Sequence, residues 1–105
     1  MIFIETPVFS TQLKKLMDDD CYRELQEFLC EFPLAGDVIS GTGGIRKIRT
    51  AAKGHGKSGG ARVIYYYFAQ NSSIALLMIY PKNRQDDLTC EQRKLLRRIV
   101  GHWSE

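Results

Sequence analysis

Three cationic side chains, at Lys47, Arg49 and Arg62, have a spacing that would let them act together on a phosphate group. Residues 45–50 predict a β-strand, so Lys47 and Arg49 should project from the same face. A hairpin that folds back after residue 60 would bring Arg62 close to both. Like charges on adjacent strands destabilise a sheet unless an anion neutralises them, and the arginine fork matches phosphate oxygens. The pattern favours a phosphate-binding face, with a solvated basic face as the alternative.

Two further cations, Lys82 and Arg84, follow the last predicted strand in the segment Pro81-Lys82-Asn83-Arg84. Cations that stand after a strand and before a helix are well placed to complete a pocket. The alternative is a charged loop in which Arg84 pairs with Asp86 or Asp87.

The glycine-rich segment 51–60 carries Lys53 and Lys57. Its Gly56-Lys57-Ser58 resembles the end of a P-loop, and its glycines match GxGxxG and GxxG patterns. Each of these patterns needs an adjacent helix, whereas strands are predicted on both sides here. The segment could instead close its backbone amides and two lysines over a phosphate chain, or it could be a hairpin tip without function.

The distribution of charge points to an anionic partner. Residues 38–85 contain eight Lys and Arg and no Asp or Glu, whereas residues 1–37 contain eight acids and three basic residues. Protein surfaces normally mix the two signs, so a long acid-free stretch indicates that an external anion neutralises it. Nucleic acid is the commonest such partner. Tyr80 and the tyrosines at 65–67 could stack on unpaired bases there, or they could belong to the core.

The elements that must position these side chains can be read from hydrophobic spacing and capping residues. A strand is expected at residues 1–5, a helix that Thr6 and Pro7 begin, and a second helix from Asp18–Asp20 to Pro33. A loop at 34–44 precedes strands at 45–50, 61–69 and 74–80. A final helix begins near Thr89 with a capping box, and its inner stripe is expected to be Leu88, Gln92, Leu95, Leu96, Ile99 and Trp103, with Arg93 outside it. The order β-α-α-β-β-β-α predicts one α+β domain over residues 1–105, with helices covering a mostly antiparallel sheet.

Composition excludes several other classes of protein. The 105 residues are 44% hydrophobic and 26% charged, which is typical of a globular domain rather than a disordered or fibrous chain. The longest apolar run, residues 74–80, is far shorter than the roughly 20 residues of a membrane span, and the first seven residues lack the basic region of a secretory signal. Cys21, Cys30 and Cys90 form no CxxC pair, and no metal-ligand set is evident. We therefore expect a cytoplasmic protein without a metal or cofactor.

Taken together, these residues resemble the RelE superfamily of bacterial toxins, and most closely its HigB-like branch in type II toxin–antitoxin systems. The resemblance rests on residues 34–49, which include GTGGIRKIR, on residues 60–66 and 79–83, and on the last helix. It implies a RelE-like fold with the element order given above. It also implies a ribosome-dependent mRNA endonuclease held inactive by a cognate antitoxin, often a helix-turn-helix protein. The expected partners are that antitoxin, the ribosome and mRNA, with operator DNA reached through the antitoxin.

The resemblance implies roles for individual residues as well. It matches Lys47, Arg49, Arg62 and Lys82 to basic residues of the family, and we expect catalytic roles for these four. The basic and aromatic composition of the acid-free stretch adds expected RNA-binding roles for Arg46, Lys53, Lys57, Arg84 and Tyr80. The reaction would be attack of an RNA 2′-hydroxyl on its own 3′-phosphate, and preplaced cations would stabilise the charge of the transition state.

Two positions depart from the family pattern. Asn83 and Leu88 stand where some members carry an additional arginine and a catalytic-looking tyrosine, so the general acid and base are not assigned, and Lys47 is one candidate for proton transfer. The alternative function is a basic module that binds RNA or a partner without cutting.

Overall fold

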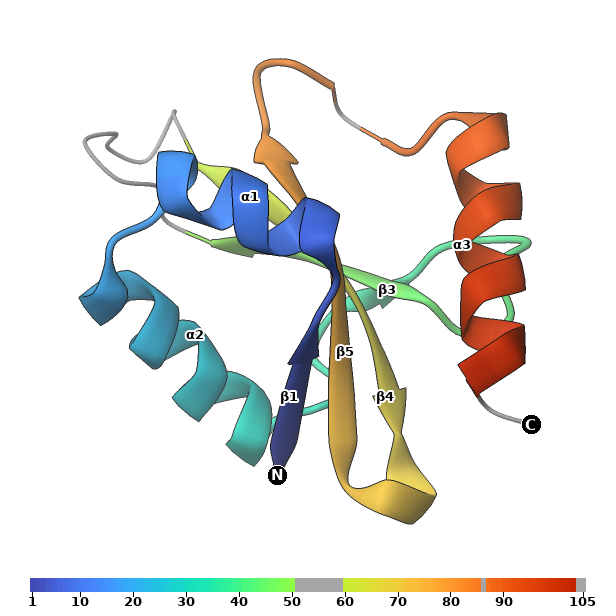
Figure 1. Cartoon of the computed structure of the whole chain (residues 1–105), viewed down its shortest axis with the longest axis horizontal. Helices are drawn as coiled ribbons and strands as arrows, with labels where there is room; N and C mark the ends of the chain where they lie inside the picture. The colour runs from blue at the N-terminus through green and yellow to red at the C-terminus, as the bar shows by residue number, and fades with distance from the viewer. Residues whose placement is uncertain (51–59, 86, 104–105) are drawn as a thin grey trace.

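The computed structural model describes residues 1–50, 60–85 and 87–103 (Figure 1). Five strands form one sheet in the order β1-β5-β4-β3-β2, in which β1 runs parallel to β5 and all other neighbours are antiparallel. The elements in chain order are β1 (Ile2–Glu5), α1 (Pro7–Leu16), α2 (Asp19–Glu31), β2 (Asp37–Val38), β3 (Arg46–Thr50), β4 (Ala61–Phe68), the 3₁₀ turn η2 (Ala69–Asn71), β5 (Ser73–Pro81) and α3 (Cys90–Trp103). The predicted α+β class with a mostly antiparallel sheet is confirmed.

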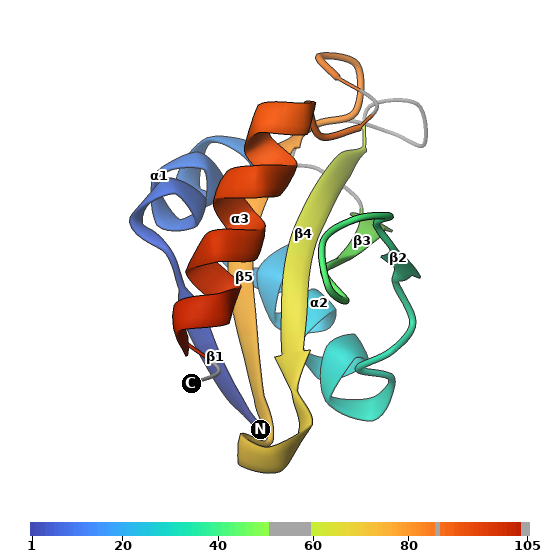
Figure 2. The ribbon, with the colours of Figure 1, turned by 90° about the vertical axis from the view of Figure 1, so that its right-hand side faces the viewer.

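Helices cover both faces of the sheet, and each face has its own hydrophobic core (Figure 2). On one face, Phe9 of α1 and Leu29 of α2 pack against side chains of β4 and β5. On the other face, Leu96 and Val100 of α3 pack against a second set from the same strands. Successive residues of a strand point to opposite faces, so the register of β3, β4 and β5 decides on which side each site residue lies.

The predicted helix starts are confirmed by their caps. The Thr6 hydroxyl accepts a hydrogen bond from the Phe9 N–H, and the Asp18 carboxylate accepts one from Cys21. At α3, the Thr89 hydroxyl accepts from the Gln92 N–H while the Gln92 side chain accepts from the Thr89 N–H, which is a reciprocal capping box. The helix starts could be predicted from the sequence because each cap involves only residues within one helical turn of each other.

Three predictions of local structure are wrong. The expected loop at 34–44 contains the short strand β2, which pairs with β3. The connection between the strands predicted at 61–69 and 74–80 begins one residue earlier than expected, as the 3₁₀ turn η2 followed by Ser72 with φ of 47°. On α3, Leu95 is 54% exposed whereas Val100 is buried, because the contact with the sheet rotates the inner stripe toward Leu96 and Val100. Every helix within the described ranges is too short or too polar to cross a bilayer.

Candidate functional site

The pairing of β3 with β4 places three predicted catalytic cations on one face of the sheet. Arg49 lies directly opposite Arg62, and Lys47 lies opposite Ile64, whose side chain belongs to the core beneath α3. Residues directly opposite each other in an antiparallel pair share a face, so these side chains lie on the α3 side of the sheet. We call Lys47, Arg49 and Arg62 the basic strip. The prediction that β3 and β4 bring them together is confirmed.

Arg62 is the central residue of the basic strip and lies between two neighbouring strands. It is opposite Arg49 on β3 and opposite Tyr80 on β5. Its Nε atom is buried and has no hydrogen-bond partner among the described residues, and Arg62 forms no ion pair with any of them. A buried donor without an acceptor costs about 1–3 kcal/mol. Within the described part of the chain, Arg62 is thus a cation without an anionic partner, placed where a phosphate oxygen could accept its hydrogen bonds.

Arg49 is exposed at the edge of the sheet. β2 pairs with β3 at Arg46 and Lys47 but not at Arg49. At Arg49, β3 therefore forms the edge of the sheet. Arg49 forms no ion pair with another residue of the described ranges. The open edge gives a bound polyanion access to the Arg49 side chain beside Arg62.

Lys47, in contrast, has an anionic neighbour. Its Nζ lies 3.5 Å from Oδ2 of Asp87, and the same oxygen lies 3.2 Å from Nη2 of Arg93. Oδ1 of Asp87 accepts a hydrogen bond of 2.9 Å from the Leu88 N–H. Asp87 thereby ties β3 to the start of α3 and holds the Lys47 ammonium on the α3 side of the sheet.

The electrostatics of Asp87 follow from these contacts. Partial burial alone would raise the pKa of Asp87, but the Leu88 N–H together with Lys47 and Arg93 lowers that pKa below the ordinary value of an aspartate. Asp87 therefore carries its negative charge at neutral pH, inside a site that is otherwise basic.

Sequence reasoning missed Asp87 and placed Arg93 outside the inner stripe. Arg93 is partly buried, and its Nε is a buried atom without a hydrogen-bond partner in the described part of the chain. The alternative pairing of Arg84 with Asp87 is wrong, because Asp87 pairs with Lys47 and Arg93; Asp86 lies outside the described residues. The one signal in the sequence was that Asp87 belongs to the acidic pair that ends the acid-free stretch.

Lys82 and Arg84 lie at the end of the sheet where β4 begins. The Lys82 N–H donates to the Gly60 carbonyl at 2.9 Å, so Lys82 lies beside the chain that leads into Arg62. Arg84 is exposed on the turn that follows, where its N–H donates to the Pro81 carbonyl at 3.1 Å. The backbone thus brings both cations to the end of the sheet that carries Arg49 and Arg62.

Of three other predicted RNA-binding residues, the structure describes only Arg46, and it lies away from the basic strip. Arg46 lies opposite Tyr65, on the α1 and α2 side of the sheet, and its Nη1 donates to the carbonyls of Leu34 and Gly36 at 3.2 and 2.7 Å. The structure therefore separates Arg46 from the basic strip and gives it a structural contact. Lys53 and Lys57 lie outside the described residues.

Tyr80 is on the correct face but is only 5% exposed, because its ring belongs to the core beneath α3. Burial leaves little of that ring for stacking on a base. Among the described residues, no group of three or more His, Cys, Asp and Glu could hold a metal ion.

One comparison with known proteins bears on this site. A model of the family described as the RelE toxin of the RelE/RelB toxin–antitoxin system matches residues 36–105. The matched part contains β2 to β5 and α3, and with them the whole basic strip, Lys82, Asp87 and Arg93.

Proposed function

This chain belongs to the RelE toxin family, and from that premise we propose that it blocks translation by cutting mRNA on the ribosome. Members of this family are toxins of toxin–antitoxin systems and are generally endoribonucleases. The observation that carries the proposal is the basic strip, and above all the buried Arg62 Nε that has no partner among the described residues. Such an arrangement is costly in the free protein and becomes favourable when a phosphate arrives.

The reaction that suits this site is transesterification within the RNA. The 2′-oxygen attacks the adjacent 3′-phosphorus, the bond to the 5′-oxygen breaks, and the products are a 2′,3′-cyclic phosphate and a 5′-hydroxyl. The proton of the 2′-hydroxyl leaves to a base, and the departing 5′-oxygen gains a proton. Negative charge accumulates on the non-bridging oxygens in the transition state, where preplaced cations stabilise it more than they stabilise the ground state.

Individual roles follow from position in the site. Arg62 and Arg49 would contact the non-bridging oxygens from adjacent strands. Lys47, whose ammonium Asp87 holds at 3.5 Å, is the candidate to donate a proton to the departing 5′-oxygen. Lys82 would contact the same or the next phosphate. These cations supply the charge that a metal ion would otherwise provide, so we propose that no metal takes part.

The wider setting is part of the same proposal. Arg84, Lys53 and Lys57 would contact the RNA backbone of the message or the ribosome through salt-dependent phosphate contacts. The regulator would be a helix-turn-helix antitoxin that also links the toxin to operator DNA, and the toxin would resemble the HigB-like branch. Its place of action would be the cytoplasm, where its ribosomal target lies.

The test is cleavage of a defined mRNA on purified ribosomes by the wild-type chain, by Arg62→Ala and by Arg98→Ala, which removes an exposed arginine of α3 as the matched control. We expect new 5′-hydroxyl ends with the wild type and the control, and a loss of at least 100-fold with Arg62→Ala. Ribosome binding without new ends in the wild type would instead identify a non-catalytic RNA-binding module. Metal independence predicts that a phosphorothioate at the cut site slows the reaction without rescue by cadmium.

A further inference from the structure

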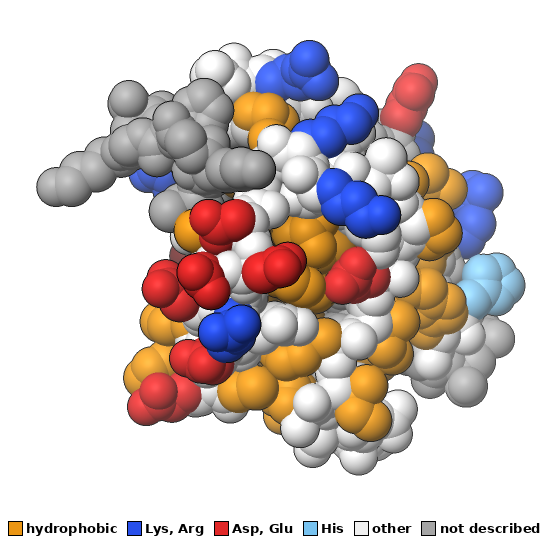
Figure 3. Space-filling view, turned by 60° about the vertical axis from the view of Figure 1, so that its left-hand side comes forward, with side chains coloured by type: hydrophobic (Ala, Val, Ile, Leu, Met, Phe, Trp, Pro, Cys, Tyr) orange, Lys and Arg blue, Asp and Glu red, His pale blue; other side chains and the backbone are white. Residues whose placement is uncertain are grey.

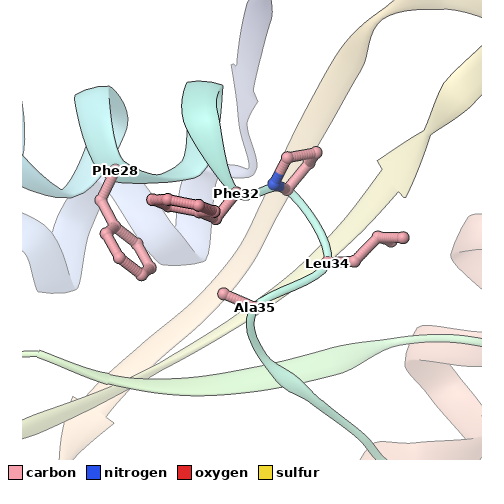
Figure 4. A pocket seen from close by; sticks show the side chains of 5 residues that line it. Phe28, Phe32, Leu34 and Ala35 are labelled. Carbon is pink, nitrogen blue, oxygen red and sulfur yellow. The ribbon is translucent and has the colours of Figure 1, made fainter.

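An apolar groove lies at the C-terminal end of α2, on the side of the molecule that α1 and α2 cover. It has a volume of 520 Å³ and is lined by Phe28, Phe32, Pro33, Leu34 and Ala35. Phe28 projects from the last turn of α2, Phe32 is the C-cap residue that follows it and its ring extends toward Phe28, and Ala35 lies below them on the segment that leads to β2 (Figure 4). Phe28, Phe32 and Leu34 are 43%, 50% and 59% exposed. A cluster of exposed large apolar side chains marks an interaction site on a small protein.

The backbone beneath this groove is held in place from the sheet. The Tyr65 hydroxyl donates to the Pro33 carbonyl at 3.0 Å and accepts from the Gly36 N–H at 2.9 Å. Arg46 donates to the Leu34 carbonyl, and the two phenylalanine rings contact each other with centroids 5.3 Å apart. A groove that is already formed in the free protein loses little conformational entropy when a partner binds.

Carboxylates flank the apolar surface. Glu24, Glu27 and Glu31 are exposed on α2, and Glu24 and Glu31 are four and three residues from Phe28, so they adjoin it on the helix surface. Figure 3 shows acidic side chains gathered on this side of the molecule among hydrophobic ones. Arg23, the one basic residue of α2, pairs with Asp20 at 3.7 Å. The α2 side of the rim is therefore negative, while the Arg46 guanidinium lies at the carbonyls of Leu34 and Gly36 on the other side of the groove.

This charge pattern decides between possible occupants. RNA phosphates would be repelled by the three glutamates. A second copy of the chain that used the same groove would bring two acidic α2 helices against each other, which is unfavourable for the same reason. A peptide segment that combines apolar side chains with Lys or Arg could pack in the groove and pair with the glutamates beside it.

We propose that this groove docks a segment of the cognate antitoxin in which apolar side chains are flanked by lysine or arginine. Membership of the toxin family supplies the partner, and the groove and its acidic rim supply the recognition chemistry. The docking surface lies on the α1 and α2 side of the sheet, whereas Lys47 and Arg62 lie on the α3 side, so it provides affinity without occupying these two residues. Arg49 lines a neighbouring pocket together with Phe28 and Glu24, so a bound segment would reach only this member of the basic strip. The inference does not depend on the RNA-cutting chemistry.

The test is titration calorimetry of the full chain with the full-length antitoxin encoded beside it. Phe28→Ser/Phe32→Ser removes the apolar contact, and Val8→Ser is the matched control because Val8 is 56% exposed on α1. Glu27→Lys reverses charge at the rim, and Gln70→Lys adds charge at the exposed η2 turn as its control. We expect both groove variants to bind the antitoxin at least about tenfold more weakly and both controls to bind as the wild type does.

Each result is decisive. Equal affinity of the groove variants and the wild type would overturn the proposal. So would self-association of the wild type that Phe28→Ser/Phe32→Ser abolishes in sedimentation, because the occupant would then be a second copy. Glu27→Lys keeps the test valid if the double serine variant unfolds. Cleavage on ribosomes should be unchanged in Glu27→Lys, and its loss together with antitoxin binding would overturn the assignment of the groove to a separate surface.

Discussion

Replacement of Arg62 by methionine should make the protein more stable and inactive at the same time. Arg62→Met keeps an unbranched side chain that can pack along β4, but it removes the buried Nε that has no partner among the described residues. It also removes the like charge opposite Arg49. Arg62 is thus expected to serve the chemistry of the site while lowering the stability of the fold.

The size of the effect follows from these two terms. An unsatisfied buried donor costs about 1–3 kcal/mol, and a pair of like charges on adjacent strands costs roughly 0.2–1 kcal/mol. We therefore expect the free energy of unfolding to rise by about 1–4 kcal/mol, and each kcal/mol corresponds to a rise in Tm of about 4–8 °C for a domain of this size. Cleavage on ribosomes should fall by about 100–1000-fold, the usual effect of losing one donor to a transition-state anion.

Thermal unfolding followed by circular dichroism and single-turnover cleavage on programmed ribosomes measure the two effects on the same preparation. Arg98→Met, at an exposed position of α3, should change neither quantity. A lower Tm for Arg62→Met would show that Arg62 contributes to the fold rather than opposing it. Cleavage at the wild-type rate would remove Arg62 from the mechanism.

Four further predictions concern Asp87 and the support beneath β3. Asp87→Asn should lower kcat about tenfold because Lys47 is no longer held, and should lower KM because a negative charge leaves the site; unchanged steady-state constants would refute this. The pKa of Asp87 is lowered in the folded state, so its stabilising effect exists above the unfolded pKa and is lost as pH falls through the folded pKa; urea unfolding should separate wild type from Asp87→Asn at pH 7 but not in strong acid. Tyr65→Phe should reduce the free energy of unfolding by about 1–3 kcal/mol, because the buried Gly36 N–H loses its acceptor, and a variant as stable as the wild type in urea would refute that role. Gly36→Ala would place Cβ 2.8 Å from the Lys47 carbonyl and should destabilise by about 1–3 kcal/mol, whereas Gly101→Ala, with no atom within 4 Å of the added Cβ, should not.

The parts of the fold that the sequence predicted are those set by neighbours along the chain. Thr6 and Asp18 cap their helices with side chains that reach only three residues ahead. Lys47 and Arg49 were placed on one face by strand alternation alone, and the hairpin then brought Arg62 opposite Arg49. Side chains alternate between the two faces along a strand, and a hairpin reverses the direction of the chain, so both features can be predicted without knowing how the elements pack. The catalytic roles of these residues remain predictions.

The parts that sequence reasoning missed depend on contacts between distant elements. Asp87 pairs with Lys47 because the start of α3 lies over β3, which no local pattern encodes. Arg46 was grouped with the cations for its type, although its register opposite Tyr65 turns it to the other face, where it holds the segment before β2. Tyr80 was a candidate for stacking, but α3 buries it. In each case the packing of one element on another determined the environment.

The most direct measurement of the central claim uses an mRNA with a single 2′-deoxynucleotide at the position cut in the all-ribose message. Transesterification needs the 2′-oxygen as the nucleophile, so the wild-type chain should leave the modified message intact at that position on programmed ribosomes while it cuts the unmodified one. Cleavage of the 2′-deoxy message at the same phosphate and at a comparable rate would contradict the mechanism assigned to Lys47, Arg49 and Arg62.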